Sequence, residues 1–122
     1  MTGGLVADHF FFATADIDTA TVAVTDLIRD FSGIGGQGDA IHGSYGAATG
    51  ANYFEAGASV ADLATLLTAA DVALDGAVQY YVGQVTGGDT YLVTDADGGG
   101  HTEVIQLVGV ALANIQLADI VA

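Results

Sequence analysis

The sequence contains no cysteine, no proline and no tryptophan, and its only basic residue is Arg29. Without cysteine, the chain can be neither a disulfide scaffold nor a thiolate metal site. Fifteen acidic residues stand against the single arginine and give a formal net charge of −14. This charge excludes nucleic acid and anionic membrane surfaces as partners, because almost nothing on the chain can neutralise phosphates.

The sequence also lacks a segment that could span a membrane. Its longest apolar stretch, residues 60–74, contains Asp62 and Asp71 and is too short and too polar for that purpose. We find no basic region followed by an apolar stretch at the N-terminus, so no signal peptide of the usual kind is expected. Export of this chain would therefore have to use another kind of signal.

The sequence does contain enough apolar residues, 52% of 122, for the core of a single domain. Apolar, β-branched and aromatic runs predict strands over residues 5–13, 21–31, 77–85, 89–94, 103–110 and 115–121. Glycine, asparagine and aspartate supply the turns between them. Residues 43–57 are small and irregular and predict a loop, so the expected fold is mainly β.

One short α-helix is expected over residues 59–74. Ser59 can cap its first turn, and Asp62 stands in the reciprocal capping position. One face then carries residues at helical spacing, with Leu66 beside them: Val60, Leu63, Leu67 and Ala70. We expect Leu63 and Leu67 to be core residues.

Two N-terminal motifs resemble those of RTX proteins, which bind calcium in β-rolls. Residues 3–10 have the spacing of the nonapeptide G-G-x-G-x-D-x-U-x, with Val6 in place of the third glycine. Residues 26–31 (DLIRDF) and 35–41 (GGQGDAI) are similar to the D-x-I-x-D-F…G-D-x-I-D-L-S block that follows the last β-roll turn in RTX proteins exported by type I secretion. The chain departs from that block at His42 and Gly43.

The C-terminal part resembles the end of the same proteins. An acidic, glycine-rich hairpin over residues 89–100 (DTYLVTDADGGG) precedes residues 103–112 (EVIQLVGVAL) and a short apolar tail, residues 118–122 (ADIVA). The resemblance implies a non-catalytic C-terminal module of a larger, secreted, calcium-dependent bacterial protein. Such a module acts as the type I secretion signal and caps the open end of the β-roll.

The resemblance also implies an arrangement within the single domain, residues 1–122. Residues 1–43 form a degenerate β-roll end with the D-x-I-x-D-F block, residues 44–58 a loop, residues 59–74 the helix and residues 77–122 the C-terminal hairpins. The fold would be a β-roll or β-sandwich-like end-cap. The secretion signal would lie in an apolar tail that frays easily and contributes modestly to the fold, at Ile115, Leu117, Ile120 and Val121.

Calcium is the expected cofactor, because a hard cation with oxygen ligands would relieve the repulsion between carboxylates. The candidate ligands are Asp8, Asp95, Asp97 and Glu103. Asp8 has motif support, but a β-roll ion lies between two successive turns, so this chain could hold only half of such a site; Asp39 lies one residue early for the motif. Residues 95–103 look like a shortened calcium loop without EF-hand spacing, and a solvated hairpin turn is the alternative.

Other motifs give no support for an enzyme. Residues 33–38 match G-x-G-x-x-G, but residues 39–46 cannot form the helix that a dinucleotide site needs. The sequence contains no G-x-S-x-G or H-E-x-x-H motif. Its three histidines lie on separate segments and are expected on the surface or in turns: His9, His42 and His101. Sheet positions, one face buried and one exposed, are expected for Tyr80, Tyr81 and Tyr91.

The partners implied are a type I secretion transporter and the upstream domains of a parent protein, and the location is extracellular or at the cell surface. The alternative is a structural self-assembly module of a surface layer, adhesin or filament. Strands could then pair between chains, because no lysine protects any sheet edge.

Overall fold

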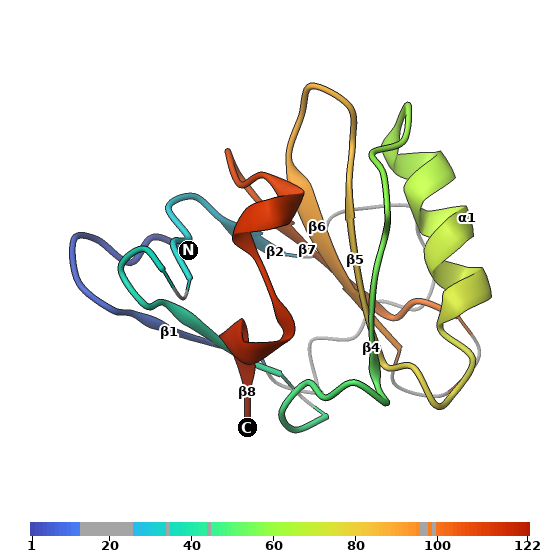
Figure 1. Cartoon of the computed structure of the whole chain (residues 1–122), viewed down its shortest axis with the longest axis horizontal. Coiled ribbons are helices and arrows are strands. Elements are labelled where there is room, and N and C mark those ends of the chain that lie inside the picture. The colour runs from blue at the N-terminus through green and yellow to red at the C-terminus, as the bar shows by residue number, and fades with distance from the viewer. Residues whose placement is uncertain (13–25, 34, 44, 96–97, 99) are drawn as a thin grey trace.

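The computed structural model describes residues 1–12, 26–33, 35–43, 45–95, 98 and 100–122. It is mainly β, with two sheets and one short α-helix, as the sequence predicts (Figure 1). The smaller sheet has the strand order β1 (His9–Phe11), β3 (Ala40–His42) and β8 (Ile120–Val121). The larger has the order β2 (Asp26–Ile28), β7 (Glu103–Leu107), β6 (Thr90–Thr94), β5 (Tyr80–Gln84) and β4 (Tyr53–Glu55).

The first four strands alternate between the two sheets, and each of their ladders is parallel. β1 pairs with β3, β2 with β7, β3 with β8 and β4 with β5 in parallel. Among the described strands, only the β5–β6 and β6–β7 pairs are antiparallel, as two consecutive hairpins. β1 and β3 pair as successive coils of a β-solenoid would, whereas β2 and β4 lie at opposite edges of the larger sheet and do not pair with each other.

The β5–β6–β7 hairpins carry apolar side chains on both faces. One face, with Tyr80 and Leu92, packs into a core that also contains Ile28, Ile41 and Ile120. The other face is covered by α1 (Leu63–Ala73). All three tyrosines of these strands are therefore buried, at 0%, 3% and 9% exposure for Tyr80, Tyr81 and Tyr91, so the expectation of an exposed face is wrong.

The helix begins later than the sequence pattern predicts. Its N-cap is Asp62, whose carboxylate accepts a hydrogen bond from the Thr65 N–H at 2.8 Å, whereas the Ser59 hydroxyl contacts Thr86 Oγ1 at 2.9 Å. The buried face is centred on Leu66, Leu67 and Ala70. Leu67 is confirmed as a core residue, but Leu63 is only half-buried.

Three further expectations about strands need correction. β4 lies within the stretch predicted as a loop, because Tyr53 and Phe54 pair with β5. The closing strand is short, since 3₁₀ helices occupy Leu112–Asn114 and Leu117–Asp119 and only Ile120–Val121 pairs as a strand. The strands predicted over residues 5–13 and 21–31 are also shorter: within the described residues, they consist of β1 and β2 alone.

The C-terminal segment is part of the core rather than a frayed tail. Ile115 and Ile120 are 2% and 1% exposed, and β8 extends the smaller sheet through its pairing with Ile41 and His42. Leu117 is the exposed apolar residue of this segment. The expected modest contribution to the fold is therefore wrong. In the described part of the chain, no helix is long and apolar enough to cross a membrane.

Candidate functional site

Two glycine-rich turns stack on each other at the N-terminal end of the sheets. The first leads into β1 and the second, residues 32–39, leads into β3. Because β1 and β3 are parallel, with His9 opposite Ala40, the two turns end at equivalent positions, Asp8 and Asp39. The Ala40 N–H donates to the Asp8 carbonyl oxygen at 2.9 Å and continues the ladder into the turns.

The Asp39 side chain links the two turns through hydrogen bonds. Its Oδ1 accepts the N–H of Asp8 at 2.9 Å, and its Oδ2 accepts the N–H of Ser32 at 2.8 Å. The side chain is buried, at 1% exposure. From the sequence, Asp39 is expected to be only a poor calcium ligand, and this structural role is not predicted. The similarity to the G-D-x-I motif around Asp39 is the signal that could have indicated it.

Asp8 occupies the matching position in the outer turn, but its carboxylate is less well satisfied. Its Oδ2 is buried and makes no hydrogen bond within the described residues. A Cβ on Gly3 would lie 2.4 Å from this oxygen, so the turn needs glycine there. Asp8 therefore lies in the outer of the two stacked turns.

Among the described strands, β1 and β2 are the outer strands of their sheets at this end. Met1 lies along β2, where its carbonyl oxygen accepts the Arg29 N–H at 3.0 Å and its terminal amine donates to the Leu27 carbonyl oxygen. This is the bonding of one residue in a parallel ladder. Seven large apolar residues of the described chain are exposed. Four of them lie in the N-terminal segment that contains the first turn and β1: Met1, Leu5, Val6 and Phe11.

The two ends of the second candidate calcium loop are buried, whereas Gly98 between them is exposed. Asp95 and Glu103 are buried, at 3% and 4% exposure, where β6 ends and β7 begins. Thr94 Oγ1 donates to Glu103 Oε2 at 3.1 Å, and the Gly98 N–H donates to Asp95 Oδ1 at 2.8 Å. Asp97 lies outside the described residues.

Nearby, burial raises the pKa of the Tyr45 hydroxyl, and the charges of Glu103 and Asp95 raise it further. In the described chain, no three histidine, aspartate or glutamate side chains converge as a metal-binding group. Asp8, Asp95 and Glu103 thus do not form one common site. Two of the predicted ligands lie together at the end of the β6–β7 hairpin, and the third lies in the stacked turns.

The structure brings together two of the histidines that the sequence places on separate segments. His9 Nδ1 and His42 Nε2 are 2.7 Å apart on neighbouring strands β1 and β3. The Phe11 ring stacks on His42 with centroids 4.0 Å apart. His101 instead contacts Asp71 of α1 at 2.6 Å.

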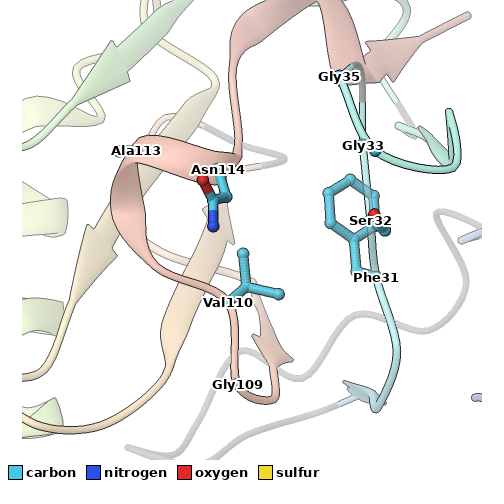
Figure 2. Close-up of a pocket in the computed structure, with 9 residues that line it drawn as sticks. Phe31, Ser32, Gly33, Gly35, Gly109, Val110, Ala113 and Asn114 are labelled. Carbon is cyan, nitrogen blue, oxygen red and sulfur yellow. The ribbon is translucent and has the colours of Figure 1, made fainter.

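A cavity of about 340 Å³ separates the second glycine turn from the segment after β7 (Figure 2). Its lining carries no charged side chain: Phe31, Ser32, Gly33, Gly35, Gly36, Gly109, Val110, Ala113 and Asn114. The residues that follow the G-x-G-x-x-G match form strand β3, where a dinucleotide site would need a helix N-terminus. The geometry therefore does not favour phosphate binding at this cavity.

Comparison with known proteins leaves the function to be argued from these sites, because no family model, curated protein or solved structure matches the chain. The likeness to RTX proteins remains a resemblance of motifs. The stacked turns and the outer edges of β1 and β2 are the features from which a function can be inferred.

Proposed function

We propose that the chain is a non-catalytic C-terminal module of a secreted, calcium-dependent protein, which caps a β-roll and carries a type I secretion signal. One observation carries the proposal. The first two strands are the outer strands of two different sheets, and both take part in parallel ladders. A preceding β-roll coil could therefore add one strand to each sheet and continue the same pattern.

The backbone of β1 has the hydrogen-bonding groups that such an addition requires. The Asp8 carbonyl and the Phe12 N–H point to β3, where they bond Ala40 and His42. Neighbouring residues of a strand alternate in direction, so the N–H and C=O groups of His9 and Phe11 point outward. Met1 makes the equivalent contacts along β2.

The antiparallel hairpins explain why the module would end a solenoid rather than extend it. After β4 the chain turns back on itself through β5, β6 and β7, so the regular alternation between sheets stops. Terminal units of repeat proteins are likewise atypical and cap the stack of repeats. One end of the domain then offers matching edges while the other closes the core.

The residues around Asp8 fit half of a calcium site. Its buried Oδ2 has no hydrogen-bond donor within the described residues, whereas both oxygens of Asp39 already accept N–H groups. When bound, calcium would supply positive charge and accept oxygen ligands from the turn on either side of it. The preceding coil would provide the missing ligands.

The net charge of −14 supports a second effect of calcium. Repulsion between the carboxylates of so acidic a chain disfavours the compact state. A cation that binds only the folded chain would offset this repulsion. Low free calcium inside a cell would then favour the unfolded chain, and higher calcium outside would favour folding.

The burial of the C-terminal segment fits an export signal that is read before folding. Ile115 and Ile120 are inaccessible in the folded domain and exposed in the unfolded chain. A type I transporter would therefore recognise the unfolded chain and release it outside the cell. Folding would hide Ile115 and Ile120 without cleavage, while Leu117 stays exposed.

The capping function can be tested by fusing six consensus G-G-x-G-x-D-x-U-x repeats before Met1. We expect calcium to induce β structure in the repeats, measured by circular dichroism, with little response to magnesium or chelator. Phe11→Pro removes an outward N–H of β1 and should abolish this folding, because proline blocks edge pairing. Glu55→Pro, a matched change on the outer strand β4, should leave it intact. Repeats that fold equally well on the Phe11→Pro variant would contradict the proposal.

A self-assembly module is the second candidate, because the same open edges could pair with another copy of the chain. Sedimentation velocity with and without calcium separates the two functions. Monomers in both conditions favour the cap. Large species that form only with calcium favour assembly.

A further inference from the structure

A second apolar surface lies at the opposite edge of the larger sheet, away from β2. β4 is the outer strand there, and α1 lies beside it (Figure 1). A groove of about 660 Å³ is formed by this strand, β5 and the helix. No charged side chain lines it: Phe54, Thr65, Thr68, Ala69, Val72, Ala73 and Tyr81.

The groove is apolar and accessible. Phe54 stacks on the buried Tyr81, with ring centroids 5.7 Å apart and planes 8° from parallel, yet remains 47% exposed. Val72 on α1 is 80% exposed. Exposed apolar side chains that border one groove mark a binding surface more often than isolated ones do.

The outer edge of β4 offers backbone groups next to this groove. The Asn52 carbonyl accepts the Tyr80 N–H at 3.0 Å, and the Ala56 N–H donates to the Val82 carbonyl at 2.9 Å. By alternation, the backbone groups of Tyr53 and Glu55 point away from β5. Within the described residues, β4 pairs with no strand other than β5.

An added strand would have a definite pattern of side chains. Side chains that share the sheet face of Phe54 would enter the groove, and those between them would project with Glu55 on the opposite face. Glu55 is exposed, and its Oε2 accepts a hydrogen bond from the Tyr53 hydroxyl at 3.0 Å. The chain has no lysine and, after Arg29, no arginine, so only a partner could supply the complementary positive charge.

The charge also argues against a second copy as the occupant. Two copies would each bring a net charge of −14, and neither could place a basic side chain beside Glu55 other than Arg29. We propose that β4 and its groove bind an extended segment of another protein in which apolar residues alternate with lysine or arginine. The segment adds to β4 as a further strand, with its apolar side chains against Phe54 and Val72.

Two nine-residue peptides test the proposal directly by fluorescence anisotropy. One alternates valine with lysine and the other alternates valine with glutamate, each with the same N-terminal dye. We expect the valine–lysine peptide to bind and the valine–glutamate peptide not to bind. Binding of both with equal affinity, or of neither, would overturn the charge assignment.

Matched variants separate the groove from general attraction to an acidic protein. Val72→Lys should weaken binding of the valine–lysine peptide at least tenfold, whereas Ala64→Lys adds the same charge at an exposed helix position outside the groove and should change it less than twofold. Glu55→Pro should weaken binding tenfold through loss of an edge N–H. Equal effects of the two lysine variants, or an unaffected Glu55→Pro variant, would refute strand addition.

Sedimentation distinguishes self-association at the same surface. We expect a monomer at all protein concentrations in chelator. A concentration-dependent dimer that Val72→Lys abolishes would show that a second copy occupies the groove, and would overturn the proposal. The β-roll fusion response to calcium should be unaffected by Val72→Lys, so the two proposals can fail independently.

Discussion

The carboxylate of Asp39 accepts the backbone N–H of Asp8 at 2.9 Å, and these two aspartates hold the same position in two stacked turns. The inner carboxylate is fully used in bonds to N–H groups. The outer carboxylate has a buried oxygen with no such bond within the described residues. A preceding coil that stacks on the outer turn would give the Asp8 carboxylate a partner, and the two equivalent aspartates would then no longer differ.

Replacing Asp39 with alanine should lower the free energy of unfolding by about 3 kcal/mol, because hydrogen bonds to a charged group contribute roughly 1.5–3 kcal/mol each. Two N–H groups would lose their acceptor. Asp8→Asn should change the stability of the isolated chain by less than about 0.5 kcal/mol. Urea unfolding measures both. Similar losses for the two variants would show that the turns are not asymmetric.

The core face of α1 gives a second prediction. Leu66→Ala and Leu67→Ala should each cost about 2–5 kcal/mol, since both side chains are fully buried. Leu63→Ala should cost about 1 kcal/mol, because its side chain is half-buried. Chemical denaturation of the three variants checks the order. If the Leu63 variant were as unstable as the other two, α1 would have to be rotated about its axis so that Leu63 faces the sheet.

The chain should lose stability at alkaline pH. All five tyrosines have a raised pKa, and burial is the largest cause for each. Their contribution is fully present below about pH 10, the pKa in the unfolded chain, and is lost as pH rises toward the folded values. Tyrosinate absorbance should therefore rise together with the loss of circular dichroism. Full ionisation near pH 10 in a folded chain would contradict the prediction.

The C-terminal segment should serve both the fold and export. Deleting residues 115–122 should unfold the domain, since Ile115 and Ile120 belong to the core, and should also stop secretion through a cognate type I transporter. Ile41→Ala is the control, because Ile41 is the buried register partner of Ile120 and its loss destabilises the fold without altering the segment. It should still be secreted. Undiminished secretion of the truncated chain would place the signal elsewhere.

The sequence predicts the antiparallel hairpins well because their alternation and glycine turns are local. It cannot predict β4, since Tyr53 and Phe54 become a strand only through pairing with β5. Periodicity likewise identifies the apolar stripe of α1 but not its rotation, which the contacts of Leu66 with the sheet decide.

At the candidate site, the motif singles out Asp8 as a calcium ligand, which stays a prediction, but gives no role to Asp39, whose bonds depend on stacking with a distant turn. The burial of Asp95 and Glu103 also escapes a sequence pattern that is typical of solvated turns. The groove beside β4 was missed for the same reason as the strand itself.

Amide hydrogen exchange at His9 and Phe11 tests the capping function most directly. The N–H groups of both residues point outward from β1, an outer strand within the described part of the chain, whereas the N–H of Phe12 bonds the carbonyl oxygen of His42 and serves as the internal reference. In the isolated chain, His9 and Phe11 should exchange quickly and Phe12 slowly. In the repeat fusion with calcium, His9 and Phe11 should become protected to the level of Phe12. Fast exchange at both residues while the repeats are folded would contradict the account.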